Sequence, residues 1–235
     1  MRRKKLTRVS NDEYYEMYYP LILGGGGIGA AAALTHKSLE RFPKNWPMHF
    51  ENVLEIGAGN GEHFRFVKHN FNLYVESDVR IKLLSNNSLN GRLDERVVQQ
   101  ELNANQLSGV ASNSFDRLIA TCVLIHLENP ALVLSEIRRI LKDRGVASLY
   151  IPCEPGLMLR FFRYWTTARK GRKLGVDHLF FHYNEHRFHV LYLQAALREV
   201  FESDKVILTR YPFKFFSWNF NLWQIYQIQI NKSVA

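Results

Sequence analysis

Short apolar runs recur through the middle of the chain, and amphipathic stretches separate them. The runs at residues 53–56, 72–76, 97–102 and 146–151, together with one inside 112–124, are typical of buried strands. Helices are expected after the first run from residue 63, after the second from residue 81, and before the last run from Pro130 to a stop at Gly145. Because strands and helices alternate, the pattern predicts an α/β fold with a largely parallel, doubly wound sheet.

The chain continues on both sides of this alternating region. The pattern predicts a helix at residues 190–201 and two strands, at 206–213 and 218–230, that form an antiparallel hairpin at the sheet edge. Before the first strand, residues 13–47 form an extension with a cluster of tyrosines, a glycine hinge and a helix at 30–41. This extension either packs on the main domain or forms a lid over a bound ligand.

Composition indicates one globular domain that spans residues 1–235. Apolar residues make up 46% of the chain and charged residues 23%, which suffices for a substantial core. The formal net charge of +9 favours a partner or substrate with negative charge. Two cysteines offer no disulfide framework, and acids follow the basic start where an export signal would have an apolar segment. We therefore expect a cytoplasmic protein without a membrane span.

A dense glycine turn ends the first strand. Gly57, Gly59 and Gly61 follow the apolar run at alternate positions, so the backbone there can approach a ligand closely. A strand, a glycine turn and a helix together are typical of a nucleotide-binding corner in a parallel sheet. The spacing G-x-G-x-G differs from the dinucleotide fingerprint, and no Lys-Ser or Lys-Thr pair follows as in a phosphate-binding P-loop.

The end of the second strand carries two acids, Glu76 and Asp78. Nucleotide-binding folds of this kind hold ribose hydroxyls at this position, because a carboxylate can accept two hydrogen bonds. Asp78 fits the role better than Glu76, since it directly precedes the expected helix. An Asp in that place also serves as a helix N-cap, so both alternatives stay open.

Five stretches together resemble one enzyme family. They read V-L-E-I-G-A-G-N-G, S-D-V-R, N-A-N-Q-L, S-F-D-R-L-I-A-T-C-V-L-I-H-L-E-N-P and L-S-E-I-R-R-I-L-K-D-R-G-V-A-S-L-Y-I-P. In this order, over residues 50–153, they are similar to the class I S-adenosylmethionine-dependent methyltransferases, most of all to the branch that acts on small molecules. The resemblance implies a seven-stranded, Rossmann-like sheet with a reversed hairpin at its edge, and S-adenosylmethionine as the cofactor.

The resemblance also implies cofactor contacts for individual residues in the first half of the core. Glu55, Gly57, Gly59 and Gly61 would hold the methionine part of the cofactor. Asp78 would bind the ribose hydroxyls.

Further contacts are implied in the second half of the core. Asn103 stands where the family usually has an Asp beside the adenine amino group, and an Asn carbonyl can accept the same hydrogen bond. Thr121 and Cys122 would line the floor near the sulfonium. His126 matches a frequent histidine of the family after the fourth strand.

Residues 154–189 lie beyond the resemblance and are expected to form a helical cap that selects the substrate. Residues 157–173 combine an apolar stripe with basic residues, which favours either a cap helix or a helix that touches an anionic membrane surface or a substrate phosphate. Among the histidines that follow, His178 and His182 are candidate bases. His182 and His186 have the spacing of a metal pair, but no neighbouring Cys or acid completes a site, so we expect no bound metal.

The expected domain is therefore continuous and has four parts. They are an N-terminal lid extension at 13–47, a cofactor-binding core at 50–153, a cap at 154–189, and a C-terminal helix with edge strands at 190–235. The sequence leaves the oligomeric state open.

The expected reaction is methyl transfer to O or N of a small polar, anionic acceptor such as a sugar or a nucleotide-linked sugar. A histidine near neutrality suits the base, and His126, His178 and His182 are the candidates. Methylation of a lipid or of RNA, and a non-catalytic S-adenosylmethionine-binding module, remain alternatives. Nucleic acid is disfavoured, because the basic residues are not interleaved with aromatics as a stacking platform would require.

Overall fold

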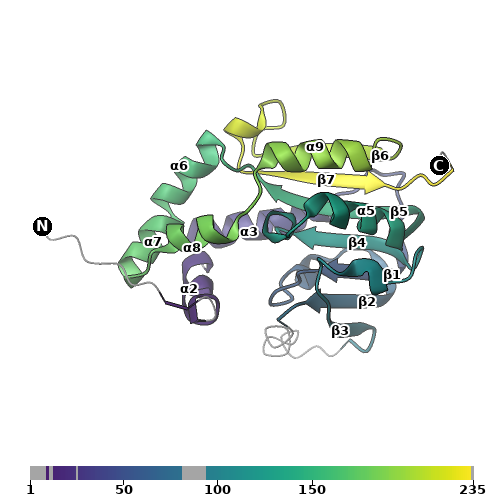
Figure 1. Cartoon of the computed structure of the whole chain (residues 1–235), viewed down its shortest axis with the longest axis horizontal. Coiled ribbons are helices and arrows are strands. Elements are labelled where there is room, and N and C mark those ends of the chain that lie inside the picture. The colour runs from purple at the N-terminus through teal and green to yellow at the C-terminus, as the bar shows by residue number, and fades with distance from the viewer. Residues whose placement is uncertain (1–8, 11–12, 25, 81–93, 234–235) are drawn as a thin grey trace, which may run out of the picture.

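The computed structural model describes residues 9–10, 13–24, 26–80 and 94–233, and these contain one seven-stranded sheet. The strands lie in the order β3-β2-β1-β4-β5-β7-β6 (Figure 1). Their bounds are β1 His49–Ile56, β2 Asn70–Asp78, β3 Val97–Glu101, β4 Phe115–Thr121, β5 Leu141–Pro152, β6 Lys205–Tyr211 and β7 Trp223–Gln229. Strands β1 to β5 are parallel, whereas β7 runs antiparallel to β5 and β6. This confirms the expected mostly parallel sheet with a reversed hairpin at its edge.

Helices cover both faces of the sheet, as the doubly wound arrangement requires. Helices α5 (Pro130–Ile140) and α9 (Val190–Val200) pack on one face, and α3 (Gly26–Leu39) covers the other (Figure 1). Fully buried side chains include Leu134, Ile137, Leu193 and Ile228 on the first face and Leu39, Val53, Tyr74 and Ile119 on the second. Because the strands are buried on both faces, they appear in the sequence as continuous apolar runs.

Helix α5 begins with a clear local signal. The Asn129 side chain accepts a hydrogen bond from the Leu132 amide at 3.1 Å, and Pro130 occupies the first turn, where no backbone donor is needed. The helix ends at Ile140, so the prediction that it continues to a stop at Gly145 was wrong. Leu141 already pairs with Phe115 of β4, and this ladder takes the chain into β5.

A second group of helices lies beyond the carboxyl ends of the parallel strands (Figure 1). The N-terminal segment supplies a π-helical turn at Tyr14–Tyr18 and α2 (Tyr19–Leu23), and the residues after β5 supply α6 (Leu157–Trp165), α7 (Thr167–Leu174) and α8 (His178–Glu185). The rings of Tyr14 and Phe181 stack with their centroids 4.2 Å apart. The N-terminal segment and the cap therefore pack against each other.

The glycine run in the N-terminal segment is less of a hinge than its composition suggests. Gly24 ends α2 in an extended conformation, but Gly26 and Gly27 belong to α3. No single helix in the described parts of the chain is long and apolar enough to cross a membrane. The segments Tyr14–Leu23 and Gly26–Leu39 reach that length and composition only together, with a bend of 96° between them.

Three further elements differ from the predictions. Only a 3-10 turn, His63–Phe66, follows the glycine turn where a helix was expected, because β2 already begins at Asn70. The single helix expected at 157–173 is broken at Thr166, whose φ of −111° and ψ of −89° are not helical. A 3-10 turn at Trp218–Phe220 precedes β7, so the last strand is shorter than expected. The helix expected from residue 81 lies outside the described residues.

Candidate functional site

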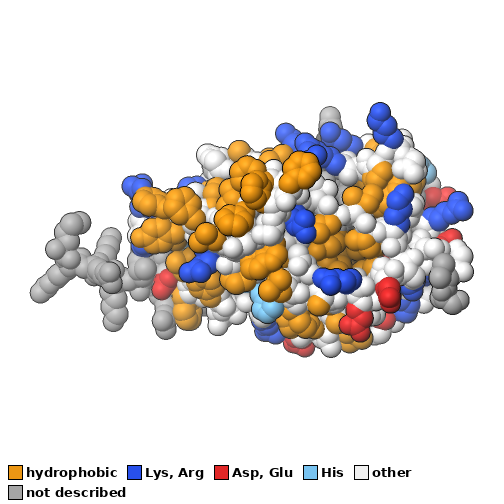
Figure 2. All heavy atoms as spheres, turned by 90° about the horizontal axis from the view of Figure 1, so that it is seen from above, with side chains coloured by type: hydrophobic (Ala, Val, Ile, Leu, Met, Phe, Trp, Pro, Cys, Tyr) orange, Lys and Arg blue, Asp and Glu red, His pale blue; other side chains and the backbone are white. Residues whose placement is uncertain are grey.

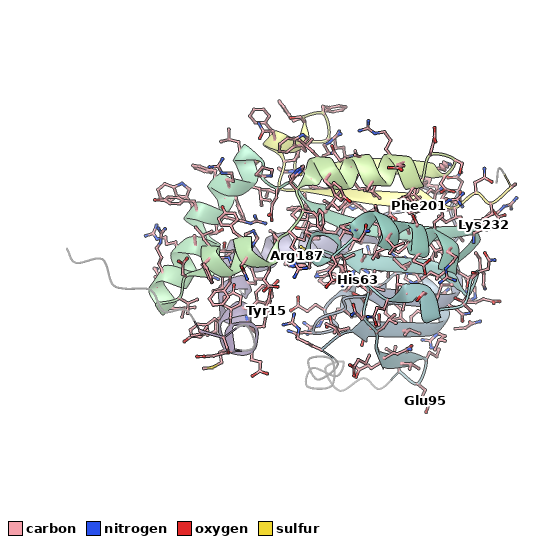
Figure 3. The ribbon with its side chains drawn as sticks, viewed as in Figure 1. Tyr15, His63, Glu95, Arg187, Phe201 and Lys232 are labelled. Atoms are coloured by element: carbon pink, nitrogen blue, oxygen red, sulfur yellow. The ribbon has the colours of Figure 1, made fainter. Side chains whose placement is uncertain are left out.

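The carboxyl ends of the parallel strands carry the residues that the sequence singled out. Gly57 follows β1, Asp78 ends β2, Thr121 ends β4, and Glu154 lies just after β5. Carboxyl ends of neighbouring parallel strands lie at one edge of a sheet, which is where open α/β folds bind ligands. The N-terminal and cap helices lie at this edge, where Figure 3 labels Tyr15 and Arg187 from segments far apart in sequence.

The glycine turn after β1 has the left-handed backbone that glycine tolerates best. The φ angles are 63° at Gly57, 57° at Gly59 and 69° at Gly61. A Cβ on Gly57 would lie 2.3 Å from a methyl of Val123, and one on Gly61 would lie 3.0 Å from the Glu76 carboxylate. A Cβ on Gly59 would meet open space. Two of the glycines thus allow close packing, and Gly59 leaves its backbone open to a ligand.

The two acids of β2 have different surroundings. Asp78 Oδ2 accepts a hydrogen bond from the Gly59 amide at 2.9 Å, and Oδ1 accepts one from the Arg80 amide at 2.8 Å. Glu76 is 1% exposed and lies beneath the turn beside Gly61, where burial raises the pKa of its carboxyl group. A carboxylate has lone pairs for further donors, so the geometry favours Asp78 over Glu76 as a ligand-binding acid.

Glu55 lies inside the fold rather than on the open side of the glycine turn. Its carboxyl group accepts a hydrogen bond from the Tyr74 hydroxyl at 2.7 Å, and Glu55 is only 1% exposed. Burial raises the pKa of Glu55 to about 7. The structure thus shows a contact that holds β1 and β2 together, and the implied contact of Glu55 with a ligand stays a prediction.

The end of β4 has two unusual features. The Thr121 hydroxyl is buried and has no hydrogen-bond partner among the described residues. Cys122 adopts a φ of 61°, a left-handed conformation that is uncommon for a residue with a side chain. A buried unpaired hydroxyl and a strained backbone at one strand end are features that cluster at functional sites.

Asn103 and His126 are each tied to a neighbouring segment. The Asn103 side-chain oxygen accepts hydrogen bonds from the backbone and side-chain nitrogens of Asn105, at 3.0 and 3.3 Å. His126 Nδ1 donates to the Glu185 carbonyl of α8 at 3.1 Å. The first contact competes with the adenine contact that was expected for Asn103, and the second fixes the His126 tautomer with Nε2 as the acceptor.

Glu154 organises a cluster that sequence reasoning missed. Its Oε1 lies 3.1 Å from His182 Nε2 and 2.7 Å from His186 Nδ1, and it also accepts a hydrogen bond from Arg163. Burial would raise the pKa of this carboxyl group, but the two histidines and the Arg163 charge hold it well below its usual range. The signal that could have found Glu154 is its position directly after a buried parallel strand, the same argument that singled out Asp78.

The acid that was thought to be missing beside His182 and His186 is therefore present. These two histidines and Glu154 each offer a ligand atom, and the three atoms lie within 4.8 Å of one another. Arg163 already binds the same carboxylate oxygen, and its positive charge opposes a cation there. The absence of a bound metal therefore stays a prediction, and the positive charge of Arg163 beside Glu154 supports it.

The N-terminal segment reaches both the cap and the core. The Tyr14 hydroxyl lies 2.5 Å from His178 Nδ1, and the Arg80 guanidinium lies over the Tyr15 ring at 4.3 Å. Burial raises the pKa of the Tyr14 hydroxyl well above its usual range, so this hydroxyl stays protonated at neutral pH and donates to His178. The expected lid extension thus contacts both α8 and Arg80, which follows β2.

Burial lowers the pKa of every histidine that was predicted as a base. The values are about 4 for His126 and His178 and about 3 for His182. Nearby Arg163 adds to the effect at His178 and His182. All three imidazoles are therefore uncharged at neutral pH and can accept a proton.

Comparisons with known proteins agree with this geometry. Residues 54–149 match the family model described as a methyltransferase domain. Residues 54–149 thus form a methyltransferase domain. No curated protein sequence matches the chain.

Solved structures show the same fold in distant proteins. An S-adenosylmethionine-dependent methyltransferase from Mesorhizobium loti is 15% identical with a TM-score of 0.58, over 87% of this chain and all of that one (100%). The carbon methyltransferase of CurJ is 18% identical with a TM-score of 0.58, over 86% of this chain and 56% of that one. The methyltransferase CalH, solved with S-adenosylhomocysteine, is 17% identical with a TM-score of 0.53, over 78% and 52% of the two chains. These similarities show the fold alone and do not identify the methyl acceptor.

The residues of this methyltransferase fit S-adenosylmethionine. The open space at Gly59 suits a ligand that lies against the backbone, and the unpaired Thr121 hydroxyl offers a polar contact at the same edge. The glycine turn would hold the methionine part and Asp78 the ribose hydroxyls. Thr121 and Cys122 would lie near the sulfonium, and Asn103 would reach adenine if it released Asn105.

Replacing Asp78 by Ala is expected to weaken cofactor binding by about 2–4 kcal/mol, or roughly 30- to 900-fold, because two charge-assisted hydrogen bonds are lost. Equilibrium dialysis with labelled S-adenosylmethionine measures the change. Glu76→Gln is the matched control and should leave the affinity within about threefold. Unchanged affinity in Asp78→Ala, with reduced thermal stability, would assign Asp78 to holding the turn and Glu76 to the ribose.

Replacing Glu55 by Gln is expected to alter how stability depends on pH. The carboxyl pKa is about 7 in the fold against an ordinary value of 4.5, so its favourable contribution is complete below about pH 4.5 and is lost as the pH rises through 7. Gln has no such loss, and the variant should gain on the order of 3 kcal/mol relative to the parent protein above pH 7. Urea unfolding at several pH values, with Glu62→Gln as a surface control, checks this. If the free energies of unfolding of Glu55→Gln and of the parent protein changed in parallel with pH, this prediction would be refuted.

Proposed function

We propose that this methyltransferase transfers a methyl group to O or N of a small polar, anionic acceptor, such as a sugar or a nucleotide-linked sugar. The observation that carries the proposal is the Glu154 carboxylate bound to two imidazoles and Arg163 beside the end of β4. The Cys122 thiol there has a pKa of about 12, raised by burial and by Glu154 and opposed by Arg163, so the cluster lies within electrostatic reach of the implied sulfonium position.

The ionised Glu154 sets the tautomers of both histidines that it binds. Because the carboxylate can only accept, His182 must carry its proton on Nε2 and His186 on Nδ1. His182 Nδ1 and His186 Nε2 then have free lone pairs for a proton. We assign the role of base to His182, with Glu154 stabilising the imidazolium once the proton has moved.

The charges around the cluster support an anionic acceptor. Burial is the main cause of the low pKa values of His126, His178 and His182. Arg163 lowers those of His178 and His182 further, and His186 and Arg80 lower that of His126, so these imidazoles are weak bases. An acceptor with a negative charge would offset these cations and raise the histidine pKa towards neutrality, where a base works best. Substrate binding would thus make His182 a better base.

Bound S-adenosylmethionine supplies an electrophilic methyl group on a sulfonium. The protein's contribution is to align the acceptor with this group and to receive the acceptor's proton. Tyr14 orients His178 from the N-terminal segment, and Arg163 orients Glu154 from α6. An enclosed set of neutral imidazoles between core, lid and cap suits a compact acceptor better than a folded macromolecule.

The test is to incubate the protein with methyl-labelled S-adenosylmethionine and separate small-molecule, lipid and RNA fractions. Label should enter the small-molecule fraction and fall strongly in His182→Gln. His126→Gln and His178→Gln serve as matched variants for the other two candidate bases, and a larger loss in either would move the role of base to it. Label only in lipid or only in RNA would refute a small acceptor. Cofactor binding without transfer to any fraction would indicate a non-catalytic binding module.

A further inference from the structure

The outer face of α6 is apolar and open to solvent. Leu157, Phe161 and Trp165 recur every four residues and are 57%, 65% and 53% exposed. A surface helix of a globular protein normally turns such a stripe to the core. Here the inner face of α6 is already used, because Leu159 is buried and Arg163 binds Glu154.

The loop between β6 and β7 extends this apolar surface. Phe213, Phe216 and Phe220 join Leu157, Met158 and Phe161 around an open groove of about 550 Å³. Phe215, at the loop tip, is 100% exposed. The Asn219 side-chain oxygen accepts a hydrogen bond from the Leu157 amide at 2.9 Å, which fixes the loop to α6. Figure 2 shows the resulting hydrophobic patch with Lys and Arg at its margins. We call it the aromatic surface.

The charge around the aromatic surface has one sign. Arg160 on α6, Lys214 on the loop, and Arg169 and Lys173 on α7 are exposed. The sequence contains no Asp or Glu at 155–176 or at 205–235, the two stretches that include the surface. A second copy of the chain would bring like charges face to face at this surface, which disfavours self-association there.

We propose that the aromatic surface docks on an anionic lipid bilayer. Phenylalanine and tryptophan side chains that protrude from a helix and a loop would enter the boundary between headgroups and acyl chains, while the flanking cations bind lipid phosphates. A fully exposed phenyl ring at a loop tip suits a fluid apolar phase. Residues of α6 and of the loop line the same groove, so one bilayer plane can meet both elements. The cap, which carries Arg163 on its inner face, would then lie at the membrane.

Vesicle co-sedimentation tests the docking directly. The protein should bind vesicles of phosphatidylcholine with phosphatidylglycerol, bind much less to phosphatidylcholine alone, and dissociate as salt is raised. The variant Phe161→Ser/Phe215→Ser/Phe216→Ser should lose at least about tenfold in binding to the anionic vesicles. Arg169→Glu/Lys173→Glu should remove the preference for anionic lipid. Thermal unfolding of each variant shows that the fold persists.

The matched control is Leu132→Ser/Leu191→Ser, which changes exposed apolar residues on α5 and α9 and should bind vesicles as the parent does. Absence of binding to anionic vesicles, or equal binding by the phenylalanine variant, would overturn the proposal. Sedimentation velocity separates the main rival. A concentration-dependent dimer that the phenylalanine substitutions abolish would assign the surface to a second copy of the chain instead.

Discussion

Replacing Glu40 by Gln is expected to lower the free energy of unfolding by about 3–5 kcal/mol, because it leaves a buried guanidinium without its counter-ion. Glu40 Oε1 accepts from Arg117 at 2.7 Å and from His63 at 3.0 Å, and Oε2 lies 3.1 Å from His69 Nδ1. The side chains of Glu40 and Arg117 are both 0% exposed. Burial alone would raise the Glu40 pKa, but Arg117 and the histidines hold it well below its usual range.

The loss should depend on pH in a defined direction. The Glu40 pKa is depressed in the fold, so its contribution is present above the ordinary value of 4.5 and shrinks as the pH falls below it. Urea unfolding provides the measurement, and Glu136→Gln, which breaks the partly exposed pair with Arg139, should cost no more than about 1 kcal/mol. Adding Arg117→Met to Glu40→Gln should restore much of the stability. An equal, small effect of Glu40→Gln and Glu136→Gln would contradict this assignment.

Replacing Glu154 by Gln is expected to lower the rate of methyl transfer by about 10²–10⁴-fold, because the amide no longer fixes the His182 tautomer or stabilises its protonated form. Glu154 acts through His182, so it is a positioning residue. Burial lowers the pKa of His182, and the hydrogen bond from His182 to Glu154 partly offsets this effect. Loss of the Glu154 carboxylate should therefore shift the acid limb of the pH–rate profile to lower pH. Steady-state kinetics across pH measure both effects.

Three comparisons separate this role from a structural one. Glu154→Asp should recover part of the rate, cofactor affinity should stay unchanged in Glu154→Gln, and the exposed Glu202→Gln should behave as the parent protein. The amide oxygen of Gln can still accept from Arg163, so the fold should survive. A rate loss that merely follows a loss of thermal stability, with the pH profile unmoved, would refute the positioning role.

The strands were predictable because burial on both faces leaves a plain mark in the sequence. The run that contains Val53, Leu54 and Ile56 has no polar side to expose, and only a central parallel strand explains it. The boundaries between helices and strands were less predictable. The apolar side chain of Leu141, for example, would fit the buried face of α5 as well as the interior of β5. Its pairing with Phe115, a tertiary contact, decides in favour of the strand.

The candidate site was predictable only where a short stretch of sequence at the end of one strand contains a recognisable motif. The glycine turn and Asp78 follow two successive strands, β1 and β2, so both could be singled out from the sequence as candidates for a nucleotide site. Glu154 meets His182 and His186 across 28 and 32 residues, and the break at Thr166 that folds the cap back is not marked by Gly or Pro. Local propensity cannot reveal a cluster that only the packing of the cap creates.

We infer that the carboxyl edge of this sheet binds S-adenosylmethionine and serves methyl transfer. Isothermal titration of the unmodified protein with S-adenosylhomocysteine tests it most directly, since the product analogue needs no acceptor. We expect saturable binding of one molecule per chain, in competition with S-adenosylmethionine. Absence of binding heat with either compound, together with no change in thermal stability on adding them, would contradict the account.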